Sequence, residues 1–283
     1  MSDNITGNEP GQTLPSAVPA APRVRGLVPR APLKLRTIFG ATFRLFAQNP
    51  RPNLGASVAV GIVASALGYL ITALAGPAGN PFVSVLSTLA LLLLTGFIGL
   101  SVATAIAGEK LTFVSLLSRL KPRLPTLIVW AVIATAVAAL AYGPTLYLRV
   151  GDPSSPPNPL ILGVVAISSV LSLLLVFYTV RLVYVPVIVA VEGGTVLEAV
   201  RRSFRLSRGY FWWTFGVLGL TVIGLGIPAG IIVALERNLG AAPLVIGVVS
   251  CVLNVIFGAV IAAVTSLMYF NLRFRKDGPG TTI

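Results

Sequence analysis

The sequence predicts an all-α, polytopic membrane protein with six transmembrane helices and three amphipathic interfacial helices on the cytoplasmic side. Composition is the first observation behind this prediction, because 55% of the 283 residues are hydrophobic, only 10% are charged, and the mean hydropathy is +0.92. Soluble domains carry about 25% charged residues. The second observation is that six apolar runs each exceed the roughly 20 residues that a helix needs to cross the hydrocarbon core.

The first element is a tail over residues 1–31, which is rich in Pro, Ala, Gly and small polar residues and has no aromatic side chain. Such a segment has no apolar face to offset the entropy of ordering, so we expect a disordered cytoplasmic tail. It does not read as a cleaved signal peptide, because no continuous apolar segment follows the start. We expect a six-helix membrane domain over residues 32–272 and a basic cytoplasmic tail over residues 273–283.

Turn-forming residues separate the six spans of the membrane domain. The connections at 76–81, 152–159 and 236–240 are short and contain Gly, Pro and Asn, which interrupt helices. The other connections are longer and basic. We expect the spans at about residues 54–76, 82–107, 126–148, 160–181, 211–235 and 242–270.

The Lys and Arg residues are distributed unequally between the two sides of these spans. Nineteen of the 21 lie on the side of the amino terminus, and only Arg149 and Arg237 lie on the other. The positive-inside rule therefore predicts a multi-pass plasma-membrane protein with both termini in the cytoplasm. Because the net charge of +13 borders apolar runs, it favours anionic phospholipids as partners over nucleic acid.

Each basic connection contains a stretch with apolar residues on one helical face and polar or charged residues on the other. These stretches are residues 33–48, 111–121 and 194–208. In the third, Leu197, Val200 and Phe204 form the apolar face. A helix breaker follows each stretch, namely Asn49-Pro50, Pro122 and Gly209. The pattern predicts three repeats of an amphipathic helix followed by a transmembrane hairpin. The alternative is that such loops are simply common in polytopic proteins.

Residue counts exclude several classes of chemistry. The chain has no His, one Cys (Cys251) and eight acidic residues. Acid–base catalysis by His and zinc sites of His and Cys are therefore excluded. We expect no catalytic residue, no metal and no cofactor.

The densest charge cluster is followed directly by aromatic residues. It comprises Arg201, Arg202, Arg205 and Arg208, and the aromatic residues are Tyr210, Trp212 and Trp213. Guanidinium groups bind phosphate through paired hydrogen bonds, and indole rings favour the membrane interface. The cluster predicts a docking site for anionic headgroups or for a partner protein. The alternative is that these residues only set the topology and form an aromatic belt.

Arg181 is the one charged residue that an apolar run could enclose. If the fourth span is 160–181, its side chain snorkels to the inner interface. If the span is shifted toward 168–190, Arg181 lies within the hydrocarbon and needs a partner. In the first case, Pro186 lets Val187–Val191 bend along the membrane surface and carry Glu192 with it.

Two further features concern contacts between spans. Asn254 in the sixth span is expected to form a hydrogen bond to a neighbouring helix. Gly226 and Gly230 in the fifth span have the small-xxx-small spacing that allows close helix packing.

Three stretches carry a resemblance to a known family. They are PLKLRTIFGATFRL (32–45) with Asn49-Pro50, VEGG (191–194) leading to AVRRSFRLSRGYFW (199–212), and YFNLRFRK (269–276). Together they resemble actinobacterial multi-pass membrane proteins labelled as containing a glycerophosphoryl diester phosphodiesterase membrane domain. The resemblance covers about residues 31–278 and departs at Asn271, where the family more often has Asp. It implies a six-helix membrane module, but no phosphodiesterase activity, because the chain lacks histidine and a separate soluble catalytic barrel.

The sequence therefore predicts a non-catalytic integral membrane module of the cell envelope that contacts anionic phospholipids and partner membrane proteins. Its oligomeric state is left open. The alternative is a component of a lipid or small-molecule transporter or flippase, which the lack of acidic residues within the spans and of an ATP-binding motif disfavours. A membrane-embedded enzyme is disfavoured further, because neither His nor paired carboxylates accompany the hydroxyl groups.

Overall fold

The computed structural model describes residues 35–48, 50–76, 80–107, 112–148, 159–240 and 242–277. Over these ranges the chain is helical and contains no strand, which confirms the all-α fold class. The tail predicted over residues 1–31 lies outside the described residues. The helices are α1 (Leu35–Gln48), α2 (Pro50–Ala75), α3 (Asn80–Ala107), α4 (Phe113–Leu120), α5 (Leu124–Leu148), α6 (Pro159–Leu182), α7 (Val185–Glu192), α8 (Val196–Ser207), α9 (Phe211–Asn238) and α10 (Pro243–Asp277), with a 3-10 helix η2 (Lys121–Arg123) between α4 and α5.

Within the described ranges, six helical segments are long and apolar enough to cross a membrane, which confirms the predicted number of spans. The third begins earlier than predicted, because α4, η2 and α5 follow one another without an intervening loop. The fourth extends beyond Arg181, because α7 follows α6 after only two residues. The six segments are Pro50–Ala75, Phe82–Ala107, Phe113–Val137, Ala166–Glu192, Phe211–Glu236 and Val245–Asp277.

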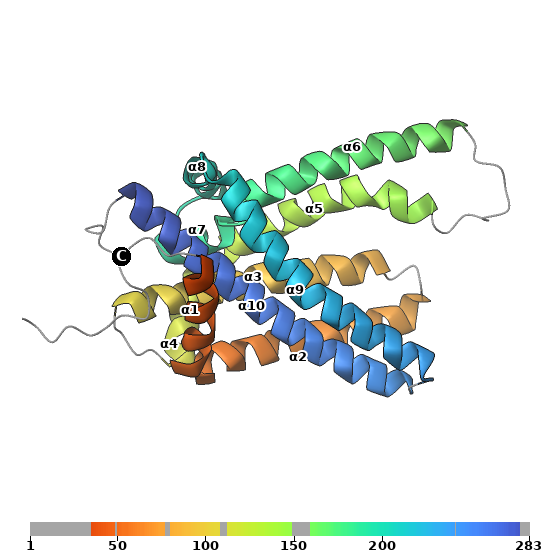
Figure 1. Ribbon diagram of the computed structural model, residues 1–283, viewed down its shortest axis with the longest axis horizontal. Helices are drawn as coiled ribbons and strands as arrows, with labels where there is room; N and C mark the ends of the chain where they lie inside the picture. The colour runs from red at the N-terminus through yellow and green to blue at the C-terminus, as the bar shows by residue number, and fades with distance from the viewer. Residues whose placement is uncertain are drawn as a thin grey trace, which may run out of the picture.

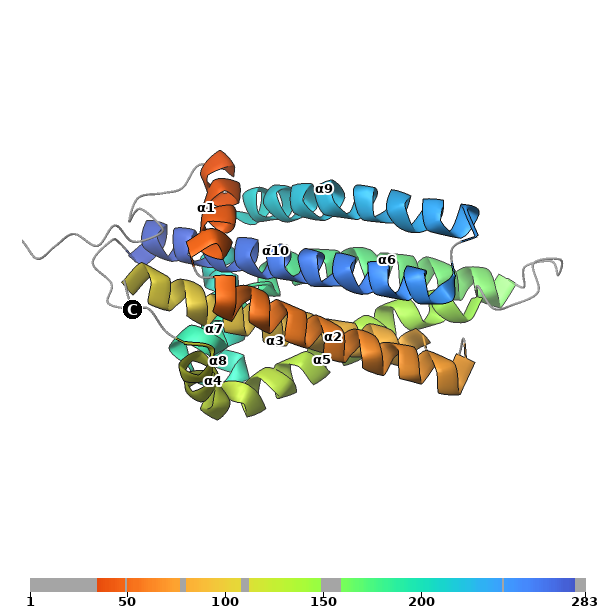
Figure 2. The ribbon, with the colours of Figure 1, turned by 90° about the horizontal axis from the view of Figure 1, so that it is seen from below.

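The ends of the long helices gather at two opposite ends of the bundle. The carboxyl ends of α2, α5 and α9 and the amino ends of α3, α6 and α10 lie at one end (Figure 1). The helices α1, α4, α7 and α8 lie at the other end with the carboxyl end of α10, as the second view also shows (Figure 2). We call this second end, formed by α1, α4, η2, α7, α8 and the last turns of α10, the basic end. The helix ends therefore alternate between the two ends of the bundle along the chain, as the predicted alternation of the spans requires.

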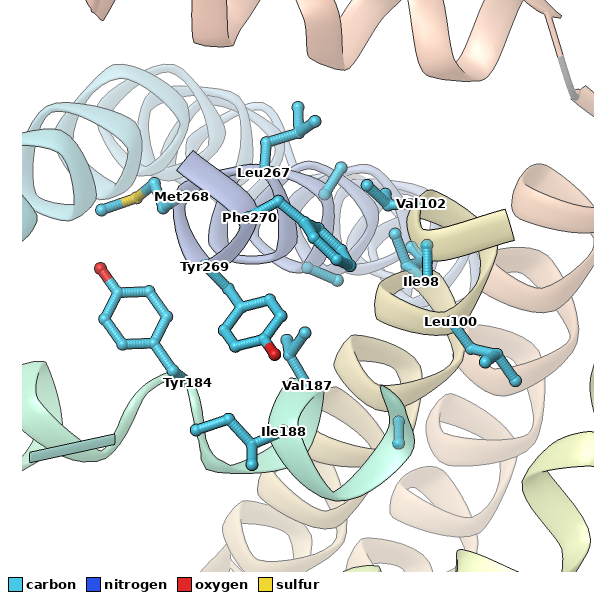
Figure 3. Packing of buried hydrophobic residues seen from close by; sticks show 14 of the residues in the cluster. Ile98, Leu100, Val102, Tyr184, Val187, Ile188, Leu267, Met268, Tyr269 and Phe270 are labelled. Atoms are coloured by element: carbon cyan, nitrogen blue, oxygen red, sulfur yellow. The ribbon is translucent and has the colours of Figure 1, made fainter. Parts of the chain in front are cut away.

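The short helix α7 is the most completely buried element of the bundle. Val185, Val187 and Val189 are fully buried, and α7 packs against α3, α5 and α8. Figure 3 shows Val187 and Ile188 close to Tyr269 of α10. The prediction that Val187–Val191 bends along the membrane surface is therefore wrong. Pro186 lies in the first turn of a new helix that enters the protein core, because the chain breaks at Val183–Tyr184 rather than within α7.

Glycines of α3 allow α7 to approach closely. A Cβ atom added to Gly99 would lie 2.9 Å from Cγ1 of Val187, and one added to Gly96 would lie 3.4 Å from Cβ of Ala190. A Cβ at Gly99 would force its neighbour to shift and one at Gly96 would already be in van der Waals contact, so α3 and α7 pack closely on this face. The close helix packing predicted at Gly226 and Gly230 is not found within the described chain, because no atom lies within 4 Å of a Cβ added at either position.

All three predicted amphipathic stretches form helices with one buried side. In α4, Leu116 and Leu120 are buried while Val114 is 74% exposed. In α1, Ile38 and Leu45 are fully buried while Phe43 is 70% exposed. In α8, the buried residues are Ala199, Ser203, Leu206 and Ser207. The predicted apolar face of α8 is thus displaced, since Leu197 is 57% exposed. The position of these helices at a membrane interface, and the threefold repeat, stay predictions.

Removing α1 is expected to destabilise the protein, because Ile38 and Leu45 are buried where α1 packs against α10 and α2. Burial of each such side chain contributes about 1.5–3 kcal/mol. A variant lacking residues 2–48 should therefore melt at a lower temperature in detergent than the full chain. A variant lacking only residues 2–28 is the control and should melt like the full chain. Equal melting temperatures for both variants would show that α1 contributes no packing.

Candidate functional site

The local sequence explains how α7 ends and α8 begins at the basic end. Gly193 and Gly194 have φ of +76° and +88°, which residues other than glycine rarely adopt, so the chain turns sharply after Glu192. Thr195 then caps α8, since its hydroxyl accepts a hydrogen bond from the Glu198 N–H at 3.4 Å. The Glu198 carboxylate accepts one from the Thr195 N–H at 3.0 Å, which completes a capping box.

Glu192, the last residue of α7, is the centre of a network of charged and polar side chains. Its Oε2 lies 2.6 Å from Nε of Arg202 in α8, and its Oε1 lies 3.6 Å from Nη1 of Arg273 in α10. The hydroxyl of Tyr269 donates a hydrogen bond to the same Oε1. Arg202 also forms an ion pair with Asp277 at 3.2 Å. We call these five residues the Glu192 network.

The Glu192 network joins three helices with balanced charge. Two guanidinium groups and two carboxylates are brought together from α7, α8 and α10, although Arg202 and Asp277 are 75 residues apart in the sequence. The side chains of Arg273 and Glu192 are only 10% and 20% exposed. A partly buried charge is costly unless it is paired, so each member depends on the others. The network holds α7, α8 and α10 in one arrangement.

The carboxyl end of α10 also contacts the end of α8. The ammonium group of Lys276 donates hydrogen bonds to the carbonyls of Arg205 and Arg208, the second at 3.0 Å. Cations stabilise the carboxyl ends of helices, because the last carbonyls there have no partner within the helix. The guanidinium of Arg275 lies 5.6 Å from the ring centroid of Tyr210 and 5.9 Å from that of Trp213. These contacts fix α8 and the start of α9 against α10.

The carboxyl end of α7 and the break before α7 are held by further polar contacts. Arg123, at the end of η2, donates a hydrogen bond to the carbonyl of Ala190. At the break, the buried hydroxyls of Tyr184 and Thr214 lie 2.8 Å apart, which links the chain to α9. The Ser203 hydroxyl donates to the carbonyl of Arg181 at 2.6 Å, so α8 contacts the end of α6.

The structure divides the predicted headgroup-docking cluster into two groups. Arg202 is turned inward to Glu192 and Asp277, and the rings of Tyr210 and Trp213 are partly covered by Arg275. These three residues therefore have internal contacts, which the prediction of a single exposed cluster did not include. The side chains of the second group are exposed and, among the described residues, form no ion pair. It consists of Arg201, Arg205 and Arg208, which we call the α8 arginine surface, and of Trp212, which is 78% exposed.

Arg181 lies in the last turn of α6 among aromatic rings. Its guanidinium carbon is 4.9 Å from the ring centroid of Phe177 and 5.8 Å from those of Phe204 and Phe211. Such cation–π contacts contribute about 0.5–1 kcal/mol at exposed positions and about 2 kcal/mol or more when water is excluded. The candidate span runs from Ala166 to Glu192 and so extends past Arg181, as the second interpretation required, and the side chain of Arg181 lies against α8 and α9.

Asn254 does not form the predicted bond to a neighbouring helix. Its amide donates to the carbonyl of Ser250, one turn earlier in α10, at 2.9 Å, and the side chain is exposed. An amide can satisfy its donor on its own helix, so the apolar surroundings of Asn254 in the sequence did not require a partner helix.

Sequence analysis missed Glu192, Tyr269, Arg273, Lys276 and Asp277 as members of a site. One signal could have identified Glu192. It is the only acidic residue between Asp152 and Glu198, and it directly follows a long apolar run on the side that carries most of the basic residues. An isolated carboxylate in such surroundings attracts arginine partners. Within the described residues, no three Cys, Asp or Glu side chains gather in a metal-binding arrangement.

Comparisons with known proteins found no similarity that extends this description: no family model, no curated protein and no solved structure matches the chain. The resemblance to the actinobacterial membrane-domain family therefore stays a prediction from the three sequence stretches.

Proposed function

We propose that the chain is a non-catalytic integral membrane module whose basic end binds anionic phospholipid headgroups and partner membrane proteins. One observation carries this proposal. Arg201 and Arg205 are exposed on α8 and Arg208 is exposed at its carboxyl-terminal cap, while the neighbouring Arg202 pairs with Glu192 and Asp277. A cluster of exposed arginines beside an exposed indole, Trp212, suits the phosphate-rich region of a membrane surface.

The environment of the α8 arginine surface supports lipid rather than nucleic acid as the ligand. Trp212 and Phe215 of α9 are exposed by 78% and 41%, and α9 continues as a candidate span directly from this surface. Exposed apolar residues next to guanidinium groups match a boundary between hydrocarbon and headgroups. A membrane-associated role for the family that the sequence resembles agrees with this interpretation.

The proposal predicts a salt-dependent preference for anionic lipid. Each Arg near an anionic surface contributes about 1 kcal/mol, so the triple variant R201Q/R205Q/R208Q should bind phosphatidylglycerol on the order of a hundredfold more weakly at low salt. Binding of fluorescent phosphatidylglycerol to the full-length protein in neutral detergent micelles measures this change. Added salt should reduce the difference between the two proteins.

A matched control separates charge from the loss of the side chains. The variant R201K/R205K/R208K keeps all three charges and should retain most of the preference for phosphatidylglycerol. Equal affinity of the unmodified protein for phosphatidylglycerol and phosphatidylcholine would contradict the proposal and leave the α8 arginine surface as a topology signal or a protein-docking face.

We expect the protein to lie in the inner membrane of a bacterium with its basic end facing the cytoplasm. The reason is that nineteen of the 21 Lys and Arg residues lie on the side of the basic end. Reporter fusions test this expectation. Fusions after residues 118, 204 and 280 should report the cytoplasm, and fusions after residues 78, 155 and 239 should report the outside. A cytoplasmic signal at residue 155 would contradict both the orientation and the pairing of the third and fourth spans.

A component of a lipid transporter or flippase is the second candidate. The observation that favours it is the exposed apolar surface of α6, where Ile167, Val170 and Leu173 are 70%, 61% and 73% exposed. In a flippase, the acyl chains of a lipid would stay in contact with such a surface while the lipid moves between the leaflets. A scrambling assay in liposomes, with fluorescent phosphatidylglycerol reduced from outside, distinguishes the candidates, because a docking module leaves half of the label protected.

A further inference from the structure

The guanidinium of Arg181 has aromatic neighbours but no anionic partner in the described part of the chain. Its Nε is buried and has no hydrogen-bond acceptor there. At the basic end, the carboxylates of Glu192 and Asp277 are engaged in ion pairs with Arg202 and Arg273. Aromatic faces attract the charge of a guanidinium but leave its N–H donors without conventional acceptors. A partly buried cation of this kind, with a buried N–H that has no acceptor, is costly unless an anion accompanies it.

An apolar stripe on α6 leads to Arg181. Ile167, Val170, Leu171 and Leu174 line a shallow depression of about 450 Å³ together with Ala166. Residues three, four and seven positions apart share one face of a helix, so Leu174 lies in line with Phe177 and Arg181. We call Ile167, Val170, Leu171, Leu174 and Phe177 the α6 stripe.

The length of the α6 stripe matches one leaflet. Fourteen residues separate Ile167 from Arg181, which corresponds to about 21 Å at the helical rise of about 1.5 Å per residue. Half of a hydrocarbon core of about 30 Å is about 15 Å. An acyl chain whose headgroup lies at Arg181 would therefore remain on the apolar stripe through its whole leaflet.

The neighbouring helix leaves the α6 stripe open. α6 and α9 meet near the basic end, where the rings of Phe177 and Phe211 are 4.8 Å apart, and the two helices diverge from there (Figure 1). Val170 and Leu174 are 61% and 50% exposed. A lipid can consequently reach the stripe from the side, without passing through the protein.

We propose that Arg181 binds the phosphate of one anionic phospholipid whose acyl chain lies along the α6 stripe. The guanidinium supplies paired N–H donors to the phosphate, and the rings of Phe177, Phe204 and Phe211 exclude water from the contact. This site deepens the proposed function and rests on it only in requiring anionic lipid at the basic end. It is distinct from the α8 arginine surface, because its charge is surrounded by aromatic rings and its lipid is held by the apolar stripe.

The test counts phospholipids that remain bound when salt screens exposed charges. The full-length protein is loaded with phosphatidylglycerol in detergent, washed at an ionic strength of about 1 M, where the Debye length is about 3 Å, and analysed by native mass spectrometry. We expect the unmodified protein to retain one phosphatidylglycerol and R181Q to retain at least tenfold less. The triple variant R201Q/R205Q/R208Q should retain the lipid, because its exposed arginines are already screened.

A second variant tests the α6 stripe without changing Arg181. Leu174→Trp fills the stripe and should lower retention at least tenfold, whereas Val132→Trp, at an exposed position of α5, should have no effect. If R181Q does not fold, the comparison of Leu174→Trp with Val132→Trp still tests whether the lipid lies on the α6 stripe. Inorganic phosphate and glycerol phosphate should fail to displace the lipid, because neither occupies the stripe.

The outcomes distinguish this site from the proposed function. Unchanged retention in R181Q or in Leu174→Trp overturns the site, as does displacement by inorganic phosphate, which would show an anion site only. If R181Q loses the retained lipid while R201Q/R205Q/R208Q leaves the salt-dependent binding intact, the site stands and the role of the α8 arginine surface fails. The opposite pair of results removes the site and leaves the proposed function.

Discussion

Replacing Glu192 with Gln should lower the free energy of unfolding by about 2–3 kcal/mol, because it removes the charge that Arg202 and Arg273 share. The net charge of the Glu192 network changes from zero to +1 among partly buried side chains. Breaking a fully buried ion pair costs about 3–5 kcal/mol, and the partial exposure of Arg202, 29%, places the expected loss below that range. The loss should be measured by unfolding the full-length protein with SDS.

Two comparisons make this prediction specific. Glu198→Gln is the matched control, since glutamine can replace glutamate in the capping box of α8, and its effect should be small. In a double-mutant cycle, Glu192→Gln and Arg202→Gln should be non-additive, because the two side chains are in direct contact at 2.6 Å. Additive effects would show that the two residues act independently and that the network does not join α7 to α8.

Replacing Gly99 with Leu should destabilise the protein by about 3 kcal/mol, since even its Cβ would lie 2.9 Å from Cγ1 of the fully buried Val187. The strain would separate α3 from α7 and weaken the position of Glu192 at the end of α7. Melting temperature in detergent and the SDS midpoint measure the change. Gly226→Leu is the control, because nothing lies within 4 Å of its added Cβ, and a helical Gly replaced by Leu gains helix propensity.

The glycine pair distinguishes packing inside one chain from packing between chains. If Gly226→Leu is as destabilising as Gly99→Leu, the small-xxx-small pair at Gly226 and Gly230 contacts another molecule, and size-exclusion chromatography of both variants would show a changed oligomeric state. Stability of Gly99→Leu equal to that of the unmodified protein would contradict the close contact of α3 and α7.

The number and alternation of the spans could be predicted because long apolar runs and flanking charges depend only on local sequence. The burial of α7 could not, since an apolar run that packs inside a protein has the same composition as one that faces lipid. The same limit applies to glycine. Gly96 and Gly99 lie against α7 while Gly226 and Gly230 meet nothing, although both pairs are closely spaced in apolar helices.

The candidate site could be predicted only in part for a related reason. The amphipathic pattern identified α8 and its exposed arginines, but the pattern does not say which arginine meets a carboxylate. Arg202 turns inward because Glu192 and Asp277, from distant parts of the chain, come together beside it. Asn254 likewise found its acceptor on its own helix rather than on a neighbour.

The most direct test of the central claim, that the α8 arginine surface gathers anionic lipid, is fluorescence quenching of Trp212 by brominated lipid. A variant with Trp130→Phe and Trp213→Phe leaves Trp212, which is 78% exposed, as the only tryptophan. The protein is placed in nanodiscs of mixed phosphatidylglycerol and phosphatidylcholine in which one of the two lipids is brominated. Brominated phosphatidylglycerol should quench Trp212 more than an equal amount of brominated phosphatidylcholine. The substitutions R201Q/R205Q/R208Q should abolish this difference. Equal quenching by the two brominated lipids in the variant with intact arginines would contradict the claim.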